Sequence, residues 1–311
     1  MRKIKCAVIG APYHVSLLKE LMKDLEIVEL IDVNGRNIGF NKEIDVLYCV
    51  FPFSLSLLKI PQIWINNRIY LIFHWIGSDV FYLTSPQNII DKVVKLSIQL
   101  IEKIRGNRIL NLASSPWLVR DLRSQGIDAV YFPLSTLNIE KMKTPNENKK
   151  DIDFLSYVPK RKFNFYGGRH ILKLAKELPE YTFMVVMPDV ENSRQLPKSP
   201  FSNLLFKPRL TFEGMQDMYL RARCFLRLTK HDGLSLSVLE SLYYKLQVIW
   251  TYPFPYVIHV SHHDDIKELK RILRDVIDNY HPNNNGHDYV VKNFSQYALR
   301  KRFSKLFRNL H

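Results

Sequence analysis

The sequence predicts an α/β protein with two doubly wound parallel sheets, and three observations lead to this fold class. Short apolar runs alternate with amphipathic runs along most of the chain, which is typical of β-α units in a parallel sheet. The alternation restarts after a polar and charged segment, KMKTPNENKK at 141–150. With 311 residues the chain is longer than most single domains and has room for two domains of about 140 residues each.

The first half contains six apolar runs of strand length. KIKCAVIG at 3–10 is the first, and a helical pattern with leucines on one face follows it at 14–25. The other strand-like runs lie at 26–32, 45–51, 68–75, 108–114 and 128–133. Amphipathic stretches at 86–105 and 115–125 separate the last three strands and are expected to be helices.

The second half repeats the pattern, beginning with DFLSYV at 153–158. Further strand-like runs lie at 182–187, 203–206, 224–229 and 246–251. Helical patterns lie at 167–178, 213–222, from about 236, at 264–279 and from 288 to the end. Ligands of such folds bind at the carboxyl ends of the strands, so two sheets joined by a linker predict a ligand cleft between the halves.

Composition narrows the possible partners without choosing one. The formal net charge of +15 favours a polyanion, and nucleic acid, an acidic membrane surface and nucleotide diphosphates all qualify. Cys6, Cys49 and Cys224 lie in apolar runs and make an odd count, which predicts buried free thiols in a reducing compartment. The short apolar run at the N-terminus does not predict a signal peptide, and no run approaches the roughly 20 apolar residues of a membrane span. We therefore expect a cytoplasmic protein.

The stretch KHDGLSLSVLESLYYKLQVI at 230–249 contains the residues that best indicate a ligand-binding site. It leaves a predicted strand at its carboxyl end and enters a helix at about Ser237, whose N-terminal N–H groups and dipole would favour phosphate in the cleft. Gly233 lets the backbone approach a ligand closely. Asp232 and Glu240 flank the turn, and carboxylates suit the hydroxyl groups of vicinal diols. The other interpretation is structural, because Ser237-x-x-Glu240 also has the spacing of a helix capping box.

DGLSLSVLESLYYKLQVI resembles the E-x7-E motif of glycosyltransferase family 4, whose members have the GT-B fold. The spacing from Asp232 to Glu240 fits that motif, with Asp232 in place of the usual first Glu. Lys245-Leu246-Gln247 stands where the family has small residues and proline. The resemblance implies that Asp232 holds hydroxyls of the donor sugar and Glu240 those of the ribose. It implies that the diphosphate lies against the backbone amides of Gly233, Leu234, Ser235, Leu236 and Ser237.

A basic loop resembles the family's diphosphate clamp. FLSYVPKRKFNFYGGRHILKLAKELPEYTFMVV looks like the first strand-loop-helix-strand unit of the donor domain, and its loop carries no acid. The candidate cations are Lys160, Arg161, Lys162 and Arg169. Guanidinium and ammonium groups suit phosphate oxygens and would stabilise the charge on the leaving diphosphate, with Arg161 and Lys162 preferred. A solvated basic loop is the alternative.

The first half has two weaker matches. HWIGSDV at 74–80 resembles the family's H-x-x-G-x-D stretch, which would place His74 near the anomeric carbon of the donor sugar and Ser78 and Asp79 near the acceptor. A histidine that ends a strand is also a common structural residue. IGAPYHVSLL resembles the first turn of the acceptor domain, where Gly10 permits tight passage of the chain, and the G-x-G-x-x-G fingerprint of nicotinamide enzymes is absent.

No metal site and no separate cofactor are expected. Asp151-Ile-Asp153 begins a strand at the wrong end for the cleft, and the neighbouring side chains of His262-His263-Asp264-Asp265 diverge. The resemblance implies metal-independent transfer from a UDP- or GDP-type donor. A catalytic Ser-His-Asp triad is not indicated, because no G-x-S-x-G turn is present.

The resemblance also assigns the domains. It implies an acceptor-side Rossmann-like domain at 1–140, a linker at 141–150 and a nucleotide-sugar-binding Rossmann-like domain at 151–285. A basic helix at 286–311 would then cross back to the first domain. Six Lys or Arg and no acid lie in its last 20 residues, so it would rest on anionic lipid or pack as an ordinary helix with a solvated face. The apolar segment at 51–65 is either lipid-facing or core.

The predicted function is retaining transfer of a hexose from a nucleotide-diphosphate sugar to a glycan or lipid-linked acceptor, at the inner membrane face or in the cytoplasm. One alternative is a sugar-nucleotide epimerase with the same GT-B fold. The other is a nucleic-acid-binding protein, which only the charge supports, because no helix-turn-helix, zinc-finger or RNP-type motif is present. We therefore expect no nucleic acid partner.

Overall fold

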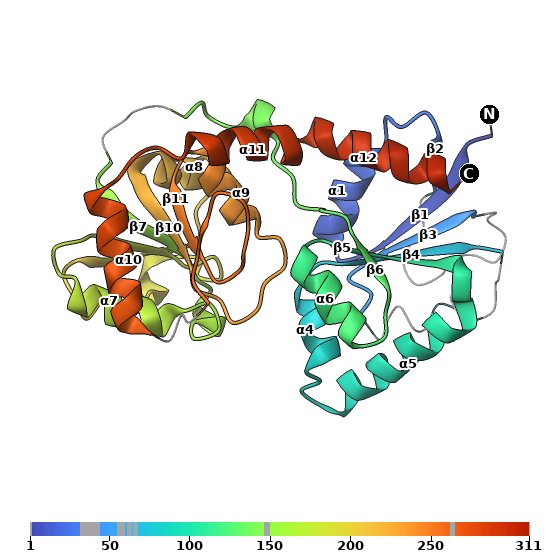
Figure 1. The fold of residues 1–311 in the computed structure, drawn as a ribbon, viewed down its shortest axis with the longest axis horizontal. Helices are drawn as coiled ribbons and strands as arrows, with labels where there is room; N and C mark the ends of the chain where they lie inside the picture. The colour runs from blue at the N-terminus through green and yellow to red at the C-terminus, as the bar shows by residue number, and fades with distance from the viewer. Residues whose placement is uncertain are drawn as a thin grey trace. The chain divides into compact units, whose positions relative to one another are not determined.

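The structure is a computed structural model, which describes residues 2–31, 44–54, 60, 64, 68–145, 150–261 and 265–310. It divides into two compact units (Figure 1). The first unit is Met1–Thr136 with Gln296–His311, and the second is Leu137–Ser295. Within the described residues, no helix is long and apolar enough to cross a membrane.

The first unit is a parallel six-stranded sheet with the order β2-β1-β3-β4-β5-β6. Its strands are β1 (Ile4–Gly10), β2 (Val28–Ile31), β3 (Val46–Val50), β4 (Tyr70–Trp75), β5 (Ile109–Ala113) and β6 (Ala129–Tyr131). Its helices are α1 (Pro12–Met22), α4 (Ser78–Thr84), α5 (Ile89–Arg105), the 3-10 helix η1 (Gly106–Arg108), α6 (Pro116–Ser124) and α12 (Gln296–Asn309). The strand order reverses between β1 and β3, so the topological switch point lies at their carboxyl ends.

The sequence explains why these elements form. All five residues of β3 are buried, as expected for a parallel strand covered on both faces. The side chain of Asn88 caps α5 by accepting a hydrogen bond from the N–H of Asp91, and Gly106 with a φ of 48° ends this helix. Short α4, with seven residues, was not predicted, because its sequence has no room for a periodic pattern.

The tail helix α12 belongs to the core of the first unit. Leu299, Phe303 and Phe307 are fully buried in the cluster that contains the strands of the first sheet. Arg300 forms an ion pair with Asp24 at 3.6 Å. The apolar side of the tail therefore packs as an ordinary helix, the second of its two sequence interpretations. The helix predicted from 288 to the end is in fact two helices, because Ser295 has an extended conformation between α11 and α12.

The second unit is a parallel six-stranded sheet with the order β12-β11-β10-β7-β8-β9. Its strands are β7 (Ile152–Tyr157), β8 (Phe183–Val186), β9 (Leu204–Lys207), β10 (Ala222–Arg227), β11 (Gln247–Trp250) and β12 (Ile258–His259). Its helices are η2 (Ile139–Lys141), η3 (Lys160–Lys162), α7 (Gly168–Glu177), η4 (Ser193–Gln195), α8 (Phe212–Arg221), α9 (Leu236–Tyr243), α10 (Ile266–Asp278) and α11 (Asn284–Phe294). Its switch point lies between β7 and β10.

Both units are thus doubly wound α/β layers, which confirms the predicted fold class. Cys6, Cys49 and Cys224 are free and buried, as predicted. Part of the predicted linker at 141–150 lies outside the described residues, at 146–149. On either side of that part, Lys143 and Lys150 donate hydrogen bonds to Gln216 and Leu220 in α8. Most of the apolar segment at 51–65 also lies outside the described residues.

Candidate functional site

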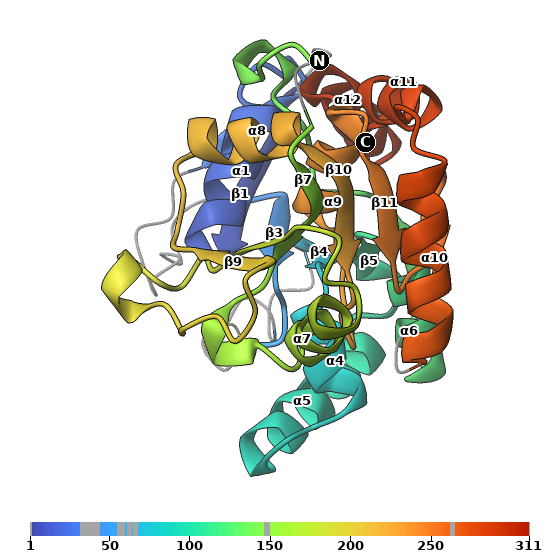
Figure 2. The same cartoon turned by 90° about the vertical axis from the view of Figure 1, so that its left-hand side faces the viewer.

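The predicted site lies at the switch point of the second sheet. Strands β7 and β10 run side by side in the middle of this sheet (Figure 2). The loop after β7 contains the predicted cations Lys160, Arg161 and Lys162, and the loop after β10 contains Asp232 and the first turn of α9. Because parallel strands end at the same edge, the topology brings both predicted groups to one edge of the second sheet.

The two loops are in direct contact. The N–H of Lys230 donates to the carbonyl of Phe165 at 3.0 Å. Gly167 has a φ of +79°, and a Cβ atom placed on it would lie 2.3 Å from the carbonyl oxygen of Leu228. Only glycine fits so close to the neighbouring backbone in this conformation. The loop after β7 is therefore held against the loop after β10.

A buried ion pair fixes Asp232. Arg227, the last residue of β10, donates from Nε to Oδ2 at 2.7 Å and from Nη2 to Oδ1 at 3.1 Å, and both side chains are only about one-tenth exposed. Its Nη1 donates to the carbonyl of Tyr157 at 3.4 Å, and its guanidinium lies 4.7 Å from the centroid of the Tyr166 ring. Although burial lowers the pKa of Arg227, the partner Asp232 outweighs it and raises this pKa. Such two-point pairing compensates the desolvation of both charges and orients Asp232.

Glu240 lies on α9 and is held by a tyrosine. The hydroxyl of Tyr219 donates to Oε2 of Glu240 at 2.8 Å. Burial raises the pKa of Glu240 to about 7, although the hydrogen bond from Tyr219 acts in the opposite direction. Glu240 is thus a carboxyl group that changes its charge near neutral pH. Groups with such shifts are common at ligand sites.

The capping-box interpretation of this stretch is wrong. Helix α9 begins at Leu236, so its N-cap is Ser235 and not Ser237, and no side chain caps it. The hydroxyls of Ser235 and Ser237 pair with each other at 2.9 Å. The first hydrogen bonds of the helix run from the N–H groups of Val238 and Leu239 to the carbonyl of Ser235. With Glu240 bonded to Tyr219, the N–H groups of Leu236 and Ser237 precede these bonds at the helix start and are suited to bind an anion.

We expect Glu240→Gln to stabilise the protein above neutral pH. The pKa of Glu240 is about 7 in the folded chain, against an ordinary value of 4.5. Between these two values the folded state keeps a proton that the unfolded state loses, so stability falls as pH rises from about 4.5 to about 7 and stays lower above that. Glutamine is neutral throughout and still accepts the bond from Tyr219. We expect a gain of about 1 to 3 kcal/mol near pH 8 and almost none near pH 4.

Urea denaturation of both proteins at a series of pH values measures this gain. Glu177→Gln is the control, because the hydrogen bond from Lys270 lowers the pKa of Glu177. Its stability difference from the unchanged protein should therefore depend on pH in the opposite direction. A pH-independent difference for Glu240→Gln would contradict the raised pKa.

The basic loop presents one open guanidinium. The N–H groups of Lys160 and Arg161 donate to the carboxylate of Asp189 at 2.7 and 2.9 Å, and this fixes the turn. The ammonium of Lys160 donates to the carbonyl of Gln195 at 2.7 Å, and that of Lys162 lies 5.9 Å from the Phe165 ring centroid. The side chain of Arg161 is exposed and makes no hydrogen bond or ion pair with the described residues. Arg161 is therefore a cation of this loop that is available to a ligand, and Arg169, in the first turn of α7, is likewise exposed.

Sequence reasoning missed four members of this cluster: Tyr157, Tyr166, Tyr219 and Arg227. Tyr157 ends β7, and its carbonyl accepts a hydrogen bond from Nη1 of Arg227 in β10. Burial raises the pKa of its hydroxyl, as do the charges of Glu240 and Asp189, while Arg209 and Arg227 lower it. One signal was readable, since Arg227 interrupts the apolar strand CFLRLT. A buried charge in a strand requires a nearby partner.

In the first unit, Gly10 lies at the switch point. It ends β1 with a φ of +137°, and a Cβ on it would lie 2.1 Å from the carbonyl oxygen of Val50 in β3. This backbone contact requires glycine. Its sequence prediction as a point of tight passage agrees with this geometry, while its role toward a ligand stays a prediction.

His74 is enclosed in the core of the first unit. It is fully buried, with Nδ1 2.6 Å from the hydroxyl of Tyr48 and Nε2 2.9 Å from the carbonyl of Phe132. Burial lowers its pKa to about 3, so the ring is neutral, with Nε2 donating to the carbonyl and Nδ1 accepting from the tyrosine. Both ring nitrogens are used, and the geometry favours the structural interpretation of His74.

The carboxylate of Asp79 likewise makes its hydrogen bonds within its own turn. It is fully buried and accepts hydrogen bonds from the N–H groups of Ile76, Gly77 and Val80 at 2.8 to 3.1 Å. Burial raises its pKa to about 6 against these hydrogen bonds. The carboxylate therefore fixes the turn between β4 and α4, whereas Ser78 beside it is exposed.

The aspartates that formally match a metal motif are paired with arginines. Asp151 forms an ion pair with Arg221 and Asp153 with Arg223, each at 2.6 Å. Among the described residues, no three His, Cys, Asp or Glu side chains are grouped as metal ligands. Positions 262–264 lie outside the described residues.

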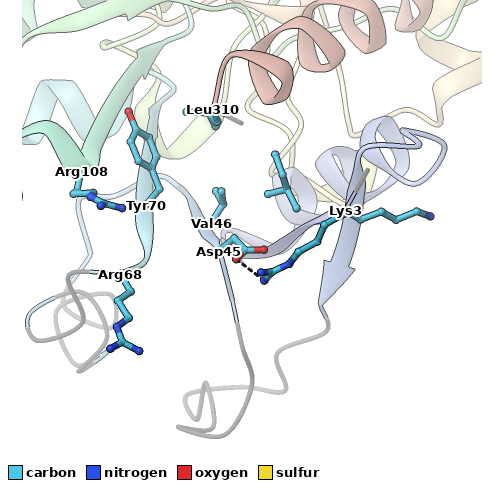
Figure 3. Close-up of a pocket in the computed structure, with 9 residues that line it drawn as sticks. Lys3, Asp45, Val46, Arg68, Tyr70, Arg108 and Leu310 are labelled. Carbon is cyan, nitrogen blue, oxygen red and sulfur yellow. Dashed lines mark hydrogen bonds and ion pairs between the residues drawn. The ribbon is translucent and has the colours of Figure 1, made fainter.

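A cavity of about 260 Å³ lies at the other edge of the first sheet, where β1, β3 and β4 begin (Figure 3). Its lining includes Arg2, Lys3, Asp45, Arg68, Tyr70 and Arg108. Arg2 forms an ion pair with Asp45 at 3.0 Å. Figure 3 shows Arg108 beside Tyr70 and Lys3 directed away from Asp45. These cations do not converge on one point, and this edge is opposite to the one that carries Gly10.

Comparisons with known proteins show the fold. No protein family and no curated protein matches the sequence. Among solved structures, sucrose-phosphate synthase from Thermosynechococcus elongatus matches with a TM-score of 0.73 and 12% identity, over 99% of each chain. AviGT4, a glycosyltransferase involved in avilamycin A biosynthesis, matches with a TM-score of 0.60 and 12% identity, over 99% of this chain and 98% of its own.

The pneumococcal O-GlcNAc transferase GtfA, solved with UDP and GlcNAc, matches with a TM-score of 0.56 and 11% identity over 85% of this chain. The present chain spans about half of GtfA, 56% of its length, but nearly all of sucrose-phosphate synthase. At these identities the likeness concerns architecture. The chain therefore has the two Rossmann-like α/β domains of the GT-B fold.

Proposed function

We propose that the chain is a glycosyltransferase that binds a nucleotide-diphosphate sugar at the carboxyl edge of its second sheet. One observation carries the proposal: the loops after β7 and β10 contact each other at the switch point and bring Glu240, the first turn of α9 and Arg161 to one edge. An anion-binding helix start between hydroxyl-binding carboxylates matches the chemistry of such a donor. Structural neighbours that include a transferase solved with UDP and GlcNAc support this assignment.

The described contacts give each residue a role in donor binding. Glu240 accepts hydrogen bonds from the ribose hydroxyls, and the amides from Gly233 to Ser237 hold the diphosphate. Asp232 contacts the sugar hydroxyls in the orientation that Arg227 sets. Arg161, with Lys160 and Lys162 beside it, neutralises the leaving diphosphate.

We further propose that a hexose is transferred with retention of configuration and without a metal ion. The bond between the anomeric carbon and the diphosphate oxygen breaks as the acceptor oxygen attacks from the same face. The acceptor proton passes to the leaving phosphate oxygen, so no protein nucleophile is required. Positioning and stabilisation of the leaving group then supply most of the rate. Gly10, His74 and Asp79 contribute by shaping the first unit, because the backbone or side chain of each is occupied by internal contacts.

Thermal-shift measurements with UDP-, GDP- and ADP-sugars test the donor site. A ligand that binds only the folded chain stabilises it by about 2.7 kcal/mol at 100 times its Kd, so one nucleotide series should raise the Tm clearly. We expect Arg161→Ala to lower donor turnover by about 10²-fold while most of the thermal shift remains, because its contact strengthens as the diphosphate leaves.

Arg194→Ala is the matched control, since Arg194 is an exposed arginine on η4 with no assigned role. It should leave both the thermal shift and turnover unchanged. Absence of a shift with every nucleotide series would refute the donor site. Equal turnover of Arg161→Ala and Arg194→Ala would refute the role of Arg161.

A further inference from the structure

Helix α5 of the first unit carries a row of large apolar side chains on the protein surface. Ile89 is 77% exposed, Leu96 66% and Leu100 49%. The complete row is Ile89, Ile90, Val93, Leu96, Leu100 and Ile104, and we call it the α5 stripe. From Ile90 on, its members recur every three or four residues, and Ile89 lies four residues before Val93, so they share one face of the helix. An isolated exposed leucine needs no explanation, but six such residues in one row indicate a binding surface.

The opposite side of α5 is already packed. Val94, Ile98 and Ile101 are buried, and α5 contacts α4 and η1. Figures 1 and 2 show α5 at the margin of the first unit, with none of its described helices or strands over the outer face. The helix is therefore apolar around more of its circumference than the described part of the first unit covers.

Charges around the stripe have one sign. Lys92 and Lys103 are exposed and lie one turn from Leu96 and Leu100, along one border of the stripe. The two acids of α5 lie on another face: Asp91 accepts a bond from the N–H of Gln87, and Glu102 accepts one from the side chain of Asn111. Directly after the helix, exposed Arg108 adds another positive charge.

We propose that the α5 stripe docks on the surface of an anionic lipid bilayer. An apolar helical face bordered by lysines lies in the plane of the interface, with the apolar side chains among the acyl chains and the lysines at the lipid phosphates. The net charge of +15 adds long-range attraction. Antiparallel pairing with α5 of a second copy fits less well, because this twofold arrangement places the same lysine border of both helices together. The surface is independent of the proposed donor site, since all of its residues belong to the first unit.

The tail helix does not offer the same surface. Its apolar residues Leu299, Phe303 and Phe307 are fully buried in the first unit, so α12 presents cations with exposed Tyr297 at its start but no row of apolar side chains. Cations alone bind a membrane weakly at physiological salt. Lipid binding that depends on apolar contact therefore identifies α5.

Vesicle flotation of the full chain tests the docking surface. We expect binding to vesicles of phosphatidylcholine with phosphatidylglycerol, and little binding to phosphatidylcholine alone. The double variant Leu96→Glu/Leu100→Glu should reduce the partition coefficient at least about tenfold, because it removes two anchors and adds charge of the wrong sign. Leu205→Glu is the control, because Leu205 is 45% exposed on β9 in the second unit. Both variants should keep the Tm, since the changed side chains are exposed.

A labelled cysteine reports on contact with the lipid directly. Cys6, Cys49 and Cys224 are buried, so Leu96→Cys can be labelled selectively with a polarity-sensitive fluorophore. Anionic vesicles should shift its emission to the blue and leave labelled Leu205→Cys unchanged. Absence of vesicle binding at low salt, or full binding by the double glutamate variant, would overturn the proposal. Concentration-dependent dimerisation that the double variant abolishes, without lipid binding, would replace it with a second copy of the chain.

Discussion

Arg227→Met is expected to lower the free energy of unfolding by about 3 to 5 kcal/mol. Arg227 and Asp232 are each about nine-tenths buried and joined by two hydrogen bonds at 2.7 and 3.1 Å. Methionine retains the volume of the arginine stem but leaves the Asp232 carboxylate buried without its cation. The carbonyl of Tyr157 also loses its contact from Nη1. The cost is therefore mainly that of an uncompensated charge and not that of a cavity.

Chemical denaturation of a set of variants separates these causes. In the double variant Arg227→Met/Asp232→Asn the uncompensated charge is gone, so more than half of the lost stability should return. Arg221→Met is the control, because it breaks an ion pair of similar length, 2.6 Å to Asp151, between side chains that are 44% and 43% exposed. It should cost less than about 1 kcal/mol. Equal losses for Arg227→Met and Arg221→Met would show that burial of the pair contributes little.

The fold was readable because most of the strands are continuous apolar runs. VLYCV and YLIFHW lie in strands that are covered on both faces. Such strands consist almost entirely of apolar residues, and this pattern is visible in the sequence. The elements that were missed are short: α4 has seven residues and β12 has two. The division of the tail at Ser295 was also missed. Both α11 and α12 are amphipathic, and a single extended residue between them does not interrupt the helical periodicity of the sequence.

The candidate site was predicted in position but not in its internal contacts. The turn between Asp232 and Glu240 could be predicted from Gly233 and from the spacing of the two acids. Sequence spacing could not show that Arg227 turns toward Asp232 and Tyr219 toward Glu240, because these contacts depend on how the loop folds over the end of the sheet. For His74 the sequence left two interpretations open, and only the positions of Tyr48 and Phe132, distant in the chain, decide which nitrogens are occupied.

Gly167→Ala is expected to cost about 3 kcal/mol or more and to disturb the donor site, whereas Gly126→Ala should cost only about 1 kcal/mol. The two glycines have nearly the same φ, +79° and +78°, so alanine meets a positive-φ strain at each position. At Gly126 a Cβ meets nothing within 4 Å. At Gly167 it would lie 2.3 Å from the carbonyl oxygen and 2.6 Å from the Cβ of Leu228, so the loops after β7 and β10 must separate.

Denaturation curves measure the difference in stability, and thermal shift with a nucleotide sugar that stabilises the unchanged protein measures the effect on the site. Separation of the loops moves the turn of Lys160 to Lys162 relative to Asp232, so Gly167→Ala should reduce the ligand-induced shift while Gly126→Ala keeps it. Gly167→Ser repeats the clash with a polar side chain and should behave like alanine, because the obstacle is the Cβ atom itself. Equal costs at the two glycines would mean that the loops can separate without loss, and close contact between them would then not be what positions the candidate donor site.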